Sequence, residues 1–429
     1  MSEALSKKIS IFSMIFLLTG LFFVYGLAVG SFKLWPYKIV DSAQSGFLSL
    51  VRYGEFIPSN RLVEVPDRLS RERFKIFQAD KIQSGYYAFM GYDGEKLTYT
   101  AWLLNDKGDQ LHSWDLSYLR LDPDGPLNGS DAPHAFKVLP DASVLVSFDS
   151  GDVMAKVDRC SKPVWTKQGV FHHSIEKGLD NSYWTWRGDN TAYAHYNYLT
   201  NFNSDTGETI QEFELVDDLV KGASTFANLF GMRADYSFKR FDKTPEDKGR
   251  IDLFHPNDID ILQPELADKF ENFEAGDLLL SFRNSNLVAV VDPKTYEIKW
   301  ARNGPWRHQH DPDFTEDGMI SVYSNNSGNG RSEIIKIDPT TNEIKNELVN
   351  GDLFFYSSAQ GKHQYLPNGN LLIVVPGEGR VVQVTADGNK VFEHNNISNI
   401  GIQYNEHVSN AQWMDKNFFN SLPSCVAAQ

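Results

Sequence analysis

The sequence predicts an all-β protein whose strands repeat at a regular interval, with one apolar helix at its N-terminus. From residue 84 onward, short runs of β-branched and aromatic residues alternate with turns rich in Gly, Asn and Asp, which is the pattern of an all-β array. One strand–turn unit recurs at the interval of a propeller blade. These observations predict a six-bladed β-propeller with an N-terminal transmembrane helix and a partly helical insertion.

The apolar run lies at residues 9–30 and carries no charge. Its 22 residues are enough to cross a bilayer as a helix. Trp35 and Tyr37 follow as candidate interfacial anchors, whereas lysines on both sides leave the charge rule for orientation nearly balanced. A cleaved signal peptide is the alternative, because residues 28–30 resemble a small-residue cleavage site. The run is longer than a usual signal-peptide core, so we expect an uncleaved anchor. We expect the rest of the chain to be exported, to the periplasmic side of the inner membrane in a Gram-negative cell.

The remaining sequence divides by its pattern. Residues 1–8 form an N-terminal tail, and residues 31–83, which show no clear period, form a connector. Residues 84–416 carry the strand pattern of the propeller, and residues 417–429 form a C-terminal tail. The strand pattern is interrupted at residues 215–249, where the composition favours helix, so we interpret this stretch as an insertion within the ring.

A strand that ends in a polar turn, followed by an apolar position, occurs six times. These segments begin at Leu104, Val157, Phe202, Val291, Ile337 and Val384. Successive starts are 53, 45, 89, 46 and 47 residues apart, and four of these five steps are one propeller blade long. The long step contains the insertion, so we interpret the array as six blades. A seventh blade hidden in that step is the alternative.

A second repeated segment precedes several of these turns. It begins at His134, His173, His310 and His363, and its counterpart in the long step begins at Asn257. We interpret each as the innermost strand of its blade, so histidines would recur near one end of the central channel. The first blade has room for only three strands, and S-N-A-Q-W-M from Ser409 is predicted to complete it. That strand would close the ring and leave no open sheet edge.

Composition limits the classes of partner. The net charge is −15 and no basic stripe is visible, so no nucleic-acid partner is expected. The apolar fraction of 41% is enough for a substantial core. The two cysteines, Cys160 and Cys425, are too few to form a metal site by themselves, and the sequence leaves open whether they pair.

Three motifs carry residues suited to chemistry. They are H-P-N-D-I-D from His255, L-L-S-F-R ending at Arg283, and W-R-H-Q-H-D-P-D-F, which contains His308 and His310. Because side chains two apart on a strand share a face, His308 and His310 are expected to point into one cavity. This spacing would also allow the two to bind a metal, but no third ligand is tied to them, so no metal is expected.

These motifs, in this order, resemble those of the bacterial arylsulfate sulfotransferases. The segments G-D-L-L-L-S-F-R-N-S-N-L-V-A-V-V-D and Q-H-D-P-D-F-T-E-D-G, followed by S-N-N-S-G-N-G-R-S, carry the likeness, which spans roughly residues 84–415. The resemblance implies a six-bladed periplasmic propeller that uses no nucleotide cofactor. It implies transfer of a sulfuryl group from an aryl sulfate ester to a phenolic or other hydroxyl acceptor through a sulfated histidine.

The resemblance also implies roles for individual residues. His310 matches the histidine that becomes sulfated, and His255 and Arg283 match groups that contact the sulfate. The pair His172 and His173 supplies a further histidine, and the repeat phase favours His173 as its catalytic member. His172, His308 and Arg331 are expected as additional substrate-binding residues.

The chemistry of these residue types agrees with the resemblance. A planar guanidinium can hold two sulfuryl oxygens at once. Neutral imidazole is a competent nucleophile near pH 7, and a second histidine, protonated in the field of the anion, can give its proton to a leaving phenolate. Histidines and one arginine are therefore sufficient, and neither a metal nor another cofactor is expected.

Other interpretations remain beside this one. A non-catalytic, membrane-anchored propeller that serves as a binding or assembly platform is the main alternative. A quinoprotein dehydrogenase is disfavoured, because the sequence has no adjacent cysteine pair and no tryptophan motif at each repeat. His134 and His363 lie outside the matching motifs, so we expect structural roles for both. The sequence also has no counterpart of the large N-terminal β-domain of soluble members.

Overall fold

The computed structural model describes residues 3–32, 61–123, 132–148, 153–188, 198–220, 227–230, 254–348, 351, 353–401 and 403–425. The chain separates into two units, Met1–Ser59 and Asn60–Gln429. The described part of the first unit is helix α1 (Glu3–Phe32). The second unit carries all of the described strands.

Helix α1 is long and apolar enough to cross a membrane. Its segment Phe12–Val29 has a mean hydropathy of 2.2, and side chains such as Phe12, Phe16 and Phe22 are exposed on it. An apolar helix of this length buries its side chains favourably in a lipid bilayer. The helix contains residues 9–30, which the sequence predicts to span a membrane, and it is a candidate for a single anchor.

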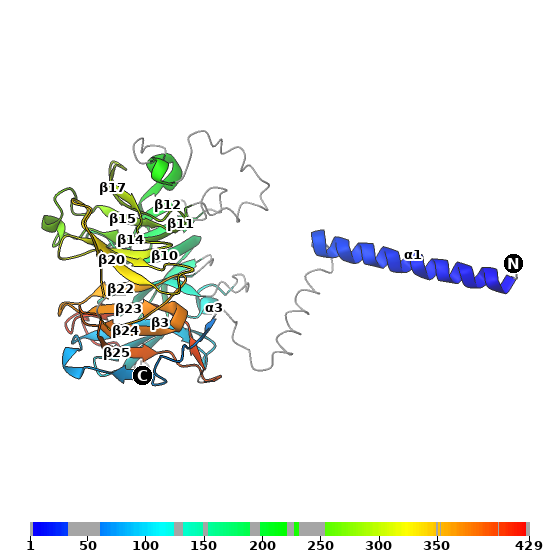
Figure 1. The fold of residues 1–429 in the computed structure, drawn as a ribbon, viewed down its shortest axis with the longest axis horizontal. Helices are drawn as coiled ribbons and strands as arrows, with labels where there is room; N and C mark the ends of the chain where they lie inside the picture. Colours follow the sequence, from blue (N-terminus) through cyan, green and yellow to red (C-terminus); the bar gives the residue numbers. More distant parts are fainter. Residues whose placement is uncertain are drawn as a thin grey trace. The chain divides into compact units, whose positions relative to one another are not determined.

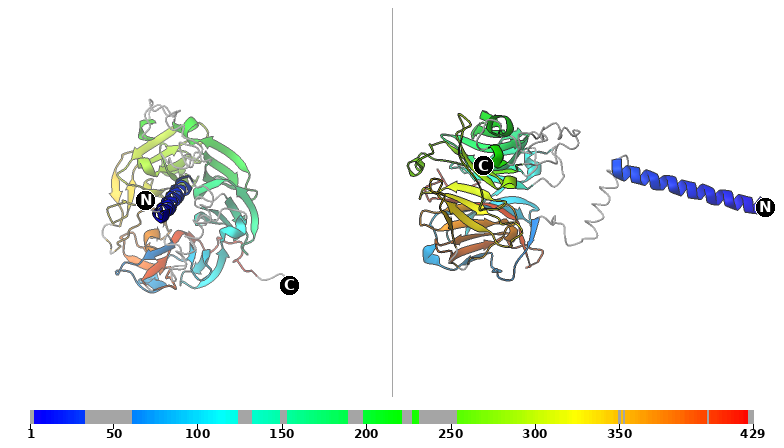
Figure 2. Two further views of the ribbon diagram at one scale, coloured as in Figure 1. Left: turned by 90° about the vertical axis from the view of Figure 1, so that its right-hand side faces the viewer. Right: turned by 45° about the horizontal axis from the view of Figure 1, so that its top comes forward.

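Six antiparallel sheets of four or five strands form the blades of the second unit, and Figure 2 shows the blades arranged as a ring. The first blade contains β27 (Val408–Met414), β3 (Tyr86–Asp93), β4 (Thr98–Asn105) and β5 (Gln110–Asp115). The second contains β6 (Pro133–Val138), β7 (Val144–Phe148), β8 (Val153–Val157) and β9 (Pro163–Gln168). The third contains β10 (Val170–Lys177), β11 (Ser182–Gly188), β12 (Tyr198–Asn203) and β13 (Thr209–Glu214).

Three more blades complete the ring, and Figure 1 labels several of their strands. The fourth contains β14 (Pro256–Ile261), β15 (Leu278–Phe282), β16 (Leu287–Val291) and β17 (Ile298–Asn303). The fifth contains β18 (His310–Phe314), β19 (Ile320–Ser324), β20 (Glu333–Ile337) and β21 (Ile344–Asn346). The sixth contains β22 (Lys362–Tyr365), β23 (Leu371–Val375), β24 (Arg380–Val384), β25 (Lys390–Asn395) and β2 (Phe74–Ile76).

The strand named first for each blade above lies innermost. A closed circle of contacts joins these six innermost strands, which are β27, β6, β10, β14, β18 and β22. The segments beginning at His134, His173, Asn257, His310 and His363 fall on or immediately within these strands, so their assignment as innermost strands is confirmed. Apolar clusters fill the space between neighbouring blades, as in the cluster that joins Trp186 and Leu199 of the third blade to Leu280 and Val291 of the fourth.

The predicted closure of the ring is confirmed. Strand β27, near the C-terminus, pairs antiparallel with β3, from Val408 opposite Gly91 to Met414 opposite Tyr86. The first blade therefore takes its innermost strand from the end of the chain and its other three strands from the beginning. Neither β3 nor β27 is left as an open edge on that side, where unpaired backbone groups would otherwise face solvent or another chain.

The segment expected as a connector also contributes strands to the ring. Strand β1 (Leu62–Glu64) pairs with β26 (Tyr404–Glu406). Strand β2 pairs with β25 and becomes the fifth strand of the sixth blade. Each of these three-residue strands is too short to show a period, so the pattern of the sequence does not distinguish them from a connector.

Short helices lie between the strands. They are η2 (Ala79–Lys81), α3 (Tyr118–Leu121), η3 (Leu215–Val220), η4 (Ala227–Phe230), η7 (Ala267–Lys269), η8 (Arg283–Ser285) and η9 (Pro376–Glu378). The π-helix η3 and the turn η4 fall in the predicted insertion, between β13 and β14. The described residues of that long step contain no seventh sheet, and the rest of the insertion lies outside the described residues.

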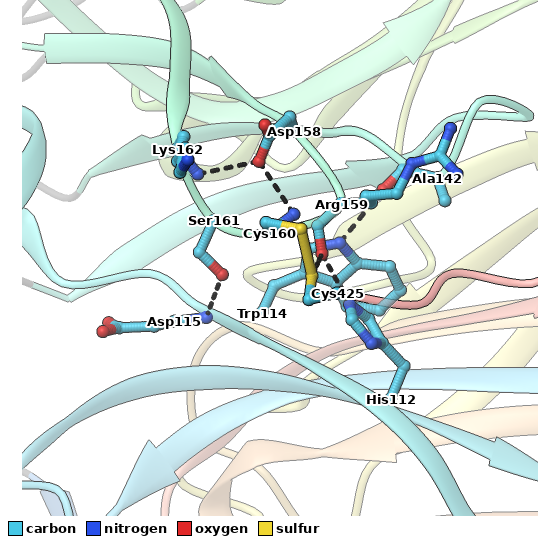
Figure 3. The surroundings of a disulfide bond; sticks show 10 residues. All are labelled: His112, Trp114, Asp115, Ala142, Asp158, Arg159, Cys160, Ser161, Lys162 and Cys425. Atoms are coloured by element: carbon cyan, nitrogen blue, oxygen red, sulfur yellow. Dashed lines mark hydrogen bonds between the residues drawn. A yellow bond between two sulfur atoms is a disulfide. The ribbon is translucent and has the colours of Figure 1, made fainter. Parts of the chain in front are cut away.

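A disulfide joins Cys160 to Cys425 (Figure 3). This answers whether the two cysteines pair, which the sequence left open. Cys160 lies in the turn between β8 and β9, and the Asp158 carboxylate accepts hydrogen bonds from the backbone N–H groups of Cys160 and Lys162. The bond spans 265 residues. It therefore closes a covalent loop that runs from β9, the last strand of the second blade, through the third to sixth blades to the closing strand β27.

Replacing Cys425 with serine is expected to lower the free energy of unfolding of the propeller by about 2–4 kcal/mol, because the unfolded chain regains the freedom that the cross-link removes. Denaturant unfolding of the full-length protein in detergent, under non-reducing conditions, measures the change. Reductant should bring the wild type to the midpoint of the variant, and Ser424→Ala should leave the midpoint unchanged. Equal midpoints for Cys425→Ser and wild type would contradict the expectation.

Candidate active site

The geometry of the candidate site begins with β-bulges near the starts of the innermost strands. The pairing register shifts between Pro133 and Ala135, His172 and Ile175, Pro256 and Asp258, His310 and Pro312, and Val408 and Asn410. A bulge adds one or more residues to one strand, bends it and re-aims its side chains, and bulges are frequent beside active sites. Five blades therefore share an irregularity at the same position of the innermost strand.

Two of the histidines at these positions have strained backbone conformations. His173 has φ 62° and His255 has φ 47°, values that residues with a Cβ seldom adopt. Such a conformation costs on the order of 1–3 kcal/mol and persists where the surrounding structure imposes it. The bulges and these left-handed residues together direct imidazoles from neighbouring blades toward one another.

The imidazoles of four successive blades form a continuous cluster. His134 Nδ1 lies 2.8 Å from His172 Nε2, and the ring centroids of His172 and His173 are 3.6 Å apart. The His173 ring lies 5.0 Å from that of His255 and 6.4 Å from that of His310. His173 is therefore the member of the adjacent pair that connects to His255 and His310.

His310 is buried at the start of β18 and is held by groups from the fifth and sixth blades. Its Nδ1 lies 2.7 Å from Asn325 Oδ1. The backbone N–H of Gln360 donates to its Nε2 at 3.3 Å. The ring is thus held from both nitrogens, which fixes its orientation toward the cluster.

Arg283 supplies the permanent positive charge of the region. It begins the turn η8 after β15, and its backbone N–H donates to the carbonyl of His255 at 3.0 Å. The half-buried guanidinium acts electrostatically on His308 and His310, because its charge contributes to lowering the pKa of both. His255 and Arg283, 28 positions apart in the sequence, are therefore brought side by side by the pairing of β14 with β15.

The environment favours neutral imidazoles in the core of the cluster. Burial lowers the pKa of His310 well below its usual range, with further lowering by His255 and Arg283, although the hydrogen bond to Asn325 opposes the shift. Burial, with the neighbouring His172 and His134, also lowers the pKa of His173 well below its usual range. Desolvation penalises the charged form of a histidine, and adjacent cations penalise it further.

The sequence-based expectation for His308 is wrong in its geometry. Strand β18 begins at His310, so His308 precedes the strand, with φ 50°, and the rule that alternate strand residues share a face does not apply. Its backbone N–H donates to Asn286 Oδ1 at 2.8 Å. Burial, with Arg283 and Arg307, lowers the pKa of its half-buried imidazole, so the side chain still lies near the charged edge of the region.

Arg331 lies on the exposed segment that follows Asn325. Its guanidinium is 5.8 Å from the centroid of the Phe354 ring, which Arg68 also contacts at 4.7 Å. Ser332, the next residue, donates through its Oγ to the carbonyl of Asn325 at 3.1 Å. Arg331 is therefore linked to the His310 region through its chain neighbours.

Sequence reasoning missed two histidines. His134, expected to be structural, lies in the cluster through its contact with His172. His407 precedes β27 as His255 precedes β14, and its Nε2 lies 2.8 Å from Gln360 Oε1. The signal for His134 was its position in the repeat. The signal for His407 was its place before the strand that closes the ring.

A buried ionic network lies farther along the innermost strands. Lys362 Nζ is 2.8 Å from carboxylate oxygens of both Asp258 and Asp311, and 3.6 Å from Glu176. His363 Nδ1 lies 2.8 Å from Asp311. Burial alone would lower the pKa of Lys362, but these three carboxylates outweigh it and raise the pKa well above its usual range. Residues of this network line a cavity of about 690 Å³.

Two groups of side chains among the described residues have donor atoms close enough together to hold a metal ion. They are His134, His172 and His173, and Asp311, Asp313 and His363, each with ligand atoms within 4.8 Å of one another. Asp311 is already ion-paired with Lys362 and His363. The first group offers nitrogen donors, which are ligands that zinc accepts. It does not include His308 and His310, the pair whose spacing in the sequence would allow metal binding.

Comparisons with known proteins add the family. Among solved structures, similar ones include a protein of unknown function from Bacteroides caccae, with 12% identity and a TM-score of 0.45 over 72% of this chain and 93% of that one. They also include Kuenenia stuttgartiensis hydrazine synthase, with 12% identity and a TM-score of 0.41 over 71% of this chain and 78% of that one. No curated protein sequence matches the chain. The family model described as Arylsulfotransferase (ASST) matches residues 135–397. Because this match covers more than half of its length, the chain belongs to the arylsulfotransferase family.

Proposed function

We propose that this protein transfers a sulfuryl group from an aryl sulfate ester to a phenolic or other hydroxyl acceptor through a sulfated His310. The observation that carries the proposal is the convergence of His173, His255 and Arg283 around a buried His310 whose environment lowers its pKa. A nucleophilic imidazole must be unprotonated, and a sulfate ester anion needs a cation. Both requirements are met within one cluster.

In the first half-reaction, we assign the attack on sulfur to His310. A new N–S bond forms as the bond between sulfur and the phenolic oxygen breaks, and the electron pair of that bond leaves with the phenolate. We assign contacts with the sulfuryl oxygens to Arg283 and His255, and two observations support this: the guanidinium charge of Arg283 acts on His310, and the backbones of Arg283 and His255 are hydrogen-bonded. Donors fixed before the reaction stabilise the charge that develops in the transition state.

His173 is the group that we assign to proton transfer. Its ring lies between those of His255 and His310. Burial and neighbouring histidines lower its pKa in the empty cluster, whereas a bound sulfate ester anion favours the protonated form. The imidazolium can then give its proton to the leaving phenolate.

The second half-reaction reverses these roles. The acceptor hydroxyl gives its proton to His173 as its oxygen attacks the sulfur on His310. The N–S bond breaks, its electron pair returns to the imidazole, and the new sulfate ester leaves. No oxidant, reductant or nucleotide enters the balance. His172, His308 and Arg331 are proposed to bind the substrates around this centre, and we propose that α1 anchors the propeller on the exported side of a membrane.

The covalent intermediate gives the direct test. Full-length protein in detergent, incubated with 4-nitrophenyl sulfate and no acceptor, is expected to gain the mass of one SO₃ group on the peptide that contains His310. Adding phenol should remove this mass and yield phenyl sulfate. His112→Ala, which alters a half-buried histidine on β5, the outer strand of the first blade, is the matched control and should behave as wild type. Nitrophenolate release without modification of any histidine would exclude this pathway.

A further inference from the structure

The contacts of Asn325 bear on which nitrogen of His310 carries a proton. Asn325 follows β19 and is fully buried, with 0% of its surface exposed. Its Nδ2 donates to two backbone carbonyls, those of Ser357 at 2.9 Å and Gln360 at 2.6 Å. Carbonyl oxygens can only accept hydrogen bonds, so the amide nitrogen of Asn325 must face them. Its Oδ1 is consequently directed at His310.

The two nitrogens of His310 are therefore distinguishable. Asn325 Oδ1 has no hydrogen to give and lies 2.7 Å from Nδ1, so Nδ1 must carry the proton in the neutral ring. Independently, the backbone N–H of Gln360 points at Nε2 at 3.3 Å, and an N–H requires an acceptor there. Both contacts specify the same tautomer, with the lone pair on Nε2, and the long hydrogen bond from Gln360 has to break when that lone pair forms a bond to sulfur.

The segment that supplies these partners is itself fixed. Ser332 Oγ accepts from the N–H of Ser357 at 3.0 Å, and Ser357 Oγ donates to the carbonyl of Ala359 at 2.6 Å. Gly361 has φ 115°, and a Cβ at that position would lie 2.5 Å from the Tyr323 ring, so only glycine fits. His407, which immediately precedes the closing strand, contacts the Gln360 side chain at 2.8 Å. The carbonyls therefore cannot turn away from Asn325 without disturbing three blades.

We propose that Asn325 is a positioning residue that holds His310 in its Nδ1–H tautomer and so makes Nε2 the atom that takes the sulfuryl group. The tautomer follows from the contacts alone, whereas its catalytic consequence rests on the proposed function. An amide is also suited to this place because it is neutral. A carboxylate partner would stabilise the positive charge of a sulfated imidazole more strongly, raising the barrier to the second half-reaction, whereas the amide orients the ring without adding a countercharge.

Nuclear magnetic resonance of nitrogen-15-labelled histidine rings tests the assignment directly. The full-length protein in detergent has 11 histidines, and the signals of His310 are identified by their loss in His310→Gln. Wild type is expected to show protonated Nδ1 and unprotonated Nε2. In Asn325→Ala, the His310 signals should move to the other tautomer or to an exchanging mixture. Asn325→Asp, which keeps an acceptor at the same place, should retain protonated Nδ1.

Activity supplies the second readout. Asn325→Ala is expected to lower kcat/KM for 4-nitrophenyl sulfate by about 10–100-fold, by analogy with the loss when a partner that orients a metal-binding histidine is removed. Asn325→Asp should move the acid limb of kcat/KM to higher pH, because a carboxylate favours the imidazolium. Asn370→Ala is the matched control: Asn370 is also buried, but it holds the backbone of Lys81 at 2.7 Å, and its loss should change neither readout.

The two readouts separate the two proposals. Protonated Nε2 in wild type, or a His310 tautomer unchanged in a folded Asn325→Ala, would overturn the role of Asn325. The tautomer does not depend on turnover, so the expected spectra in a protein that transfers no sulfuryl group would support the role of Asn325 and reject the proposed function. If Asn325→Ala does not fold, Asn325→Asp decides, because loss of protonated Nδ1 there would overturn the proposal.

Discussion

Replacing His310 with alanine is expected to reduce kcat/KM for sulfuryl transfer from 4-nitrophenyl sulfate to phenol by about 10⁴-fold or more, the scale seen when a nucleophile is deleted from a group of residues that act together. The reason is geometric. His310 is the buried imidazole that Asn325 and the Gln360 backbone hold from both sides. Stopped-flow measurement of nitrophenolate release gives the rate.

His112→Ala provides the reference for this measurement, since it removes a histidine outside the cluster. Equal losses in the two variants would mean that the rate reports general damage to the propeller. A His310→Ala variant that retained activity within about 10-fold of wild type would contradict a covalent role, because binding and charge alone do not replace a nucleophile.

The acidity of His310 adds a second test of the same assignment. Burial and the neighbouring His255 and Arg283 lower the pKa of His310, so the free protein keeps an unprotonated nucleophile at pH values below the ordinary histidine range. The acid limb of kcat/KM, which reports the free protein, should therefore fall below pH 6.5. A bound sulfate ester favours imidazolium, so the corresponding limb of kcat should lie at higher pH.

The architecture was predictable because it depends on a periodic signal. Four steps of 45 to 53 residues between strand–turn segments indicate a blade each, and the short first blade indicates closure by the end of the chain. The additional strands β1 and β2 were not predictable, since three residues carry no period. The disulfide was not predictable either, because the 265 residues between Cys160 and Cys425 give no spacing signal until the ring brings the two together.

The candidate site shows a similar division. The motifs indicated His255, Arg283 and His310, because residues that end or begin adjacent strands are placed by the pairing itself. The details depend on bulges, which shift the register by one residue or more and have no reliable sequence signal. His308 is an example of what the sequence could not predict, since its left-handed backbone conformation places it outside the strand. The motifs also missed His134, which the packing of the second blade against the third brings to His172, and His407, whose position before the closing strand brings it to Gln360.

Ending the chain at Glu406 is expected to abolish the cooperative folding of the propeller. This truncation removes β27, which pairs with β3 along its whole length, and leaves Tyr87 and Phe89, which are 1% and 0% exposed, at an uncovered edge. It also separates the sixth blade from the second, because β27 lies between them in the inner circle. The lost contacts exceed what a domain with a total stability of about 5–15 kcal/mol can tolerate.

A chain ending at Met414 is the matched control for that truncation. It keeps β27 but loses Cys425, so it should unfold cooperatively and be destabilised only by about the 2–4 kcal/mol expected for the disulfide. Near-ultraviolet circular dichroism during denaturant unfolding distinguishes the two, since the aromatic side chains packed between blades give a signal only when they are ordered. If the chain ending at Glu406 showed a cooperative transition close to that of the chain ending at Met414, the closing strand would not be what holds the ring together. The blades before it would then have to be stable as an open array, with the unpaired edge of β3 exposed to association with other chains.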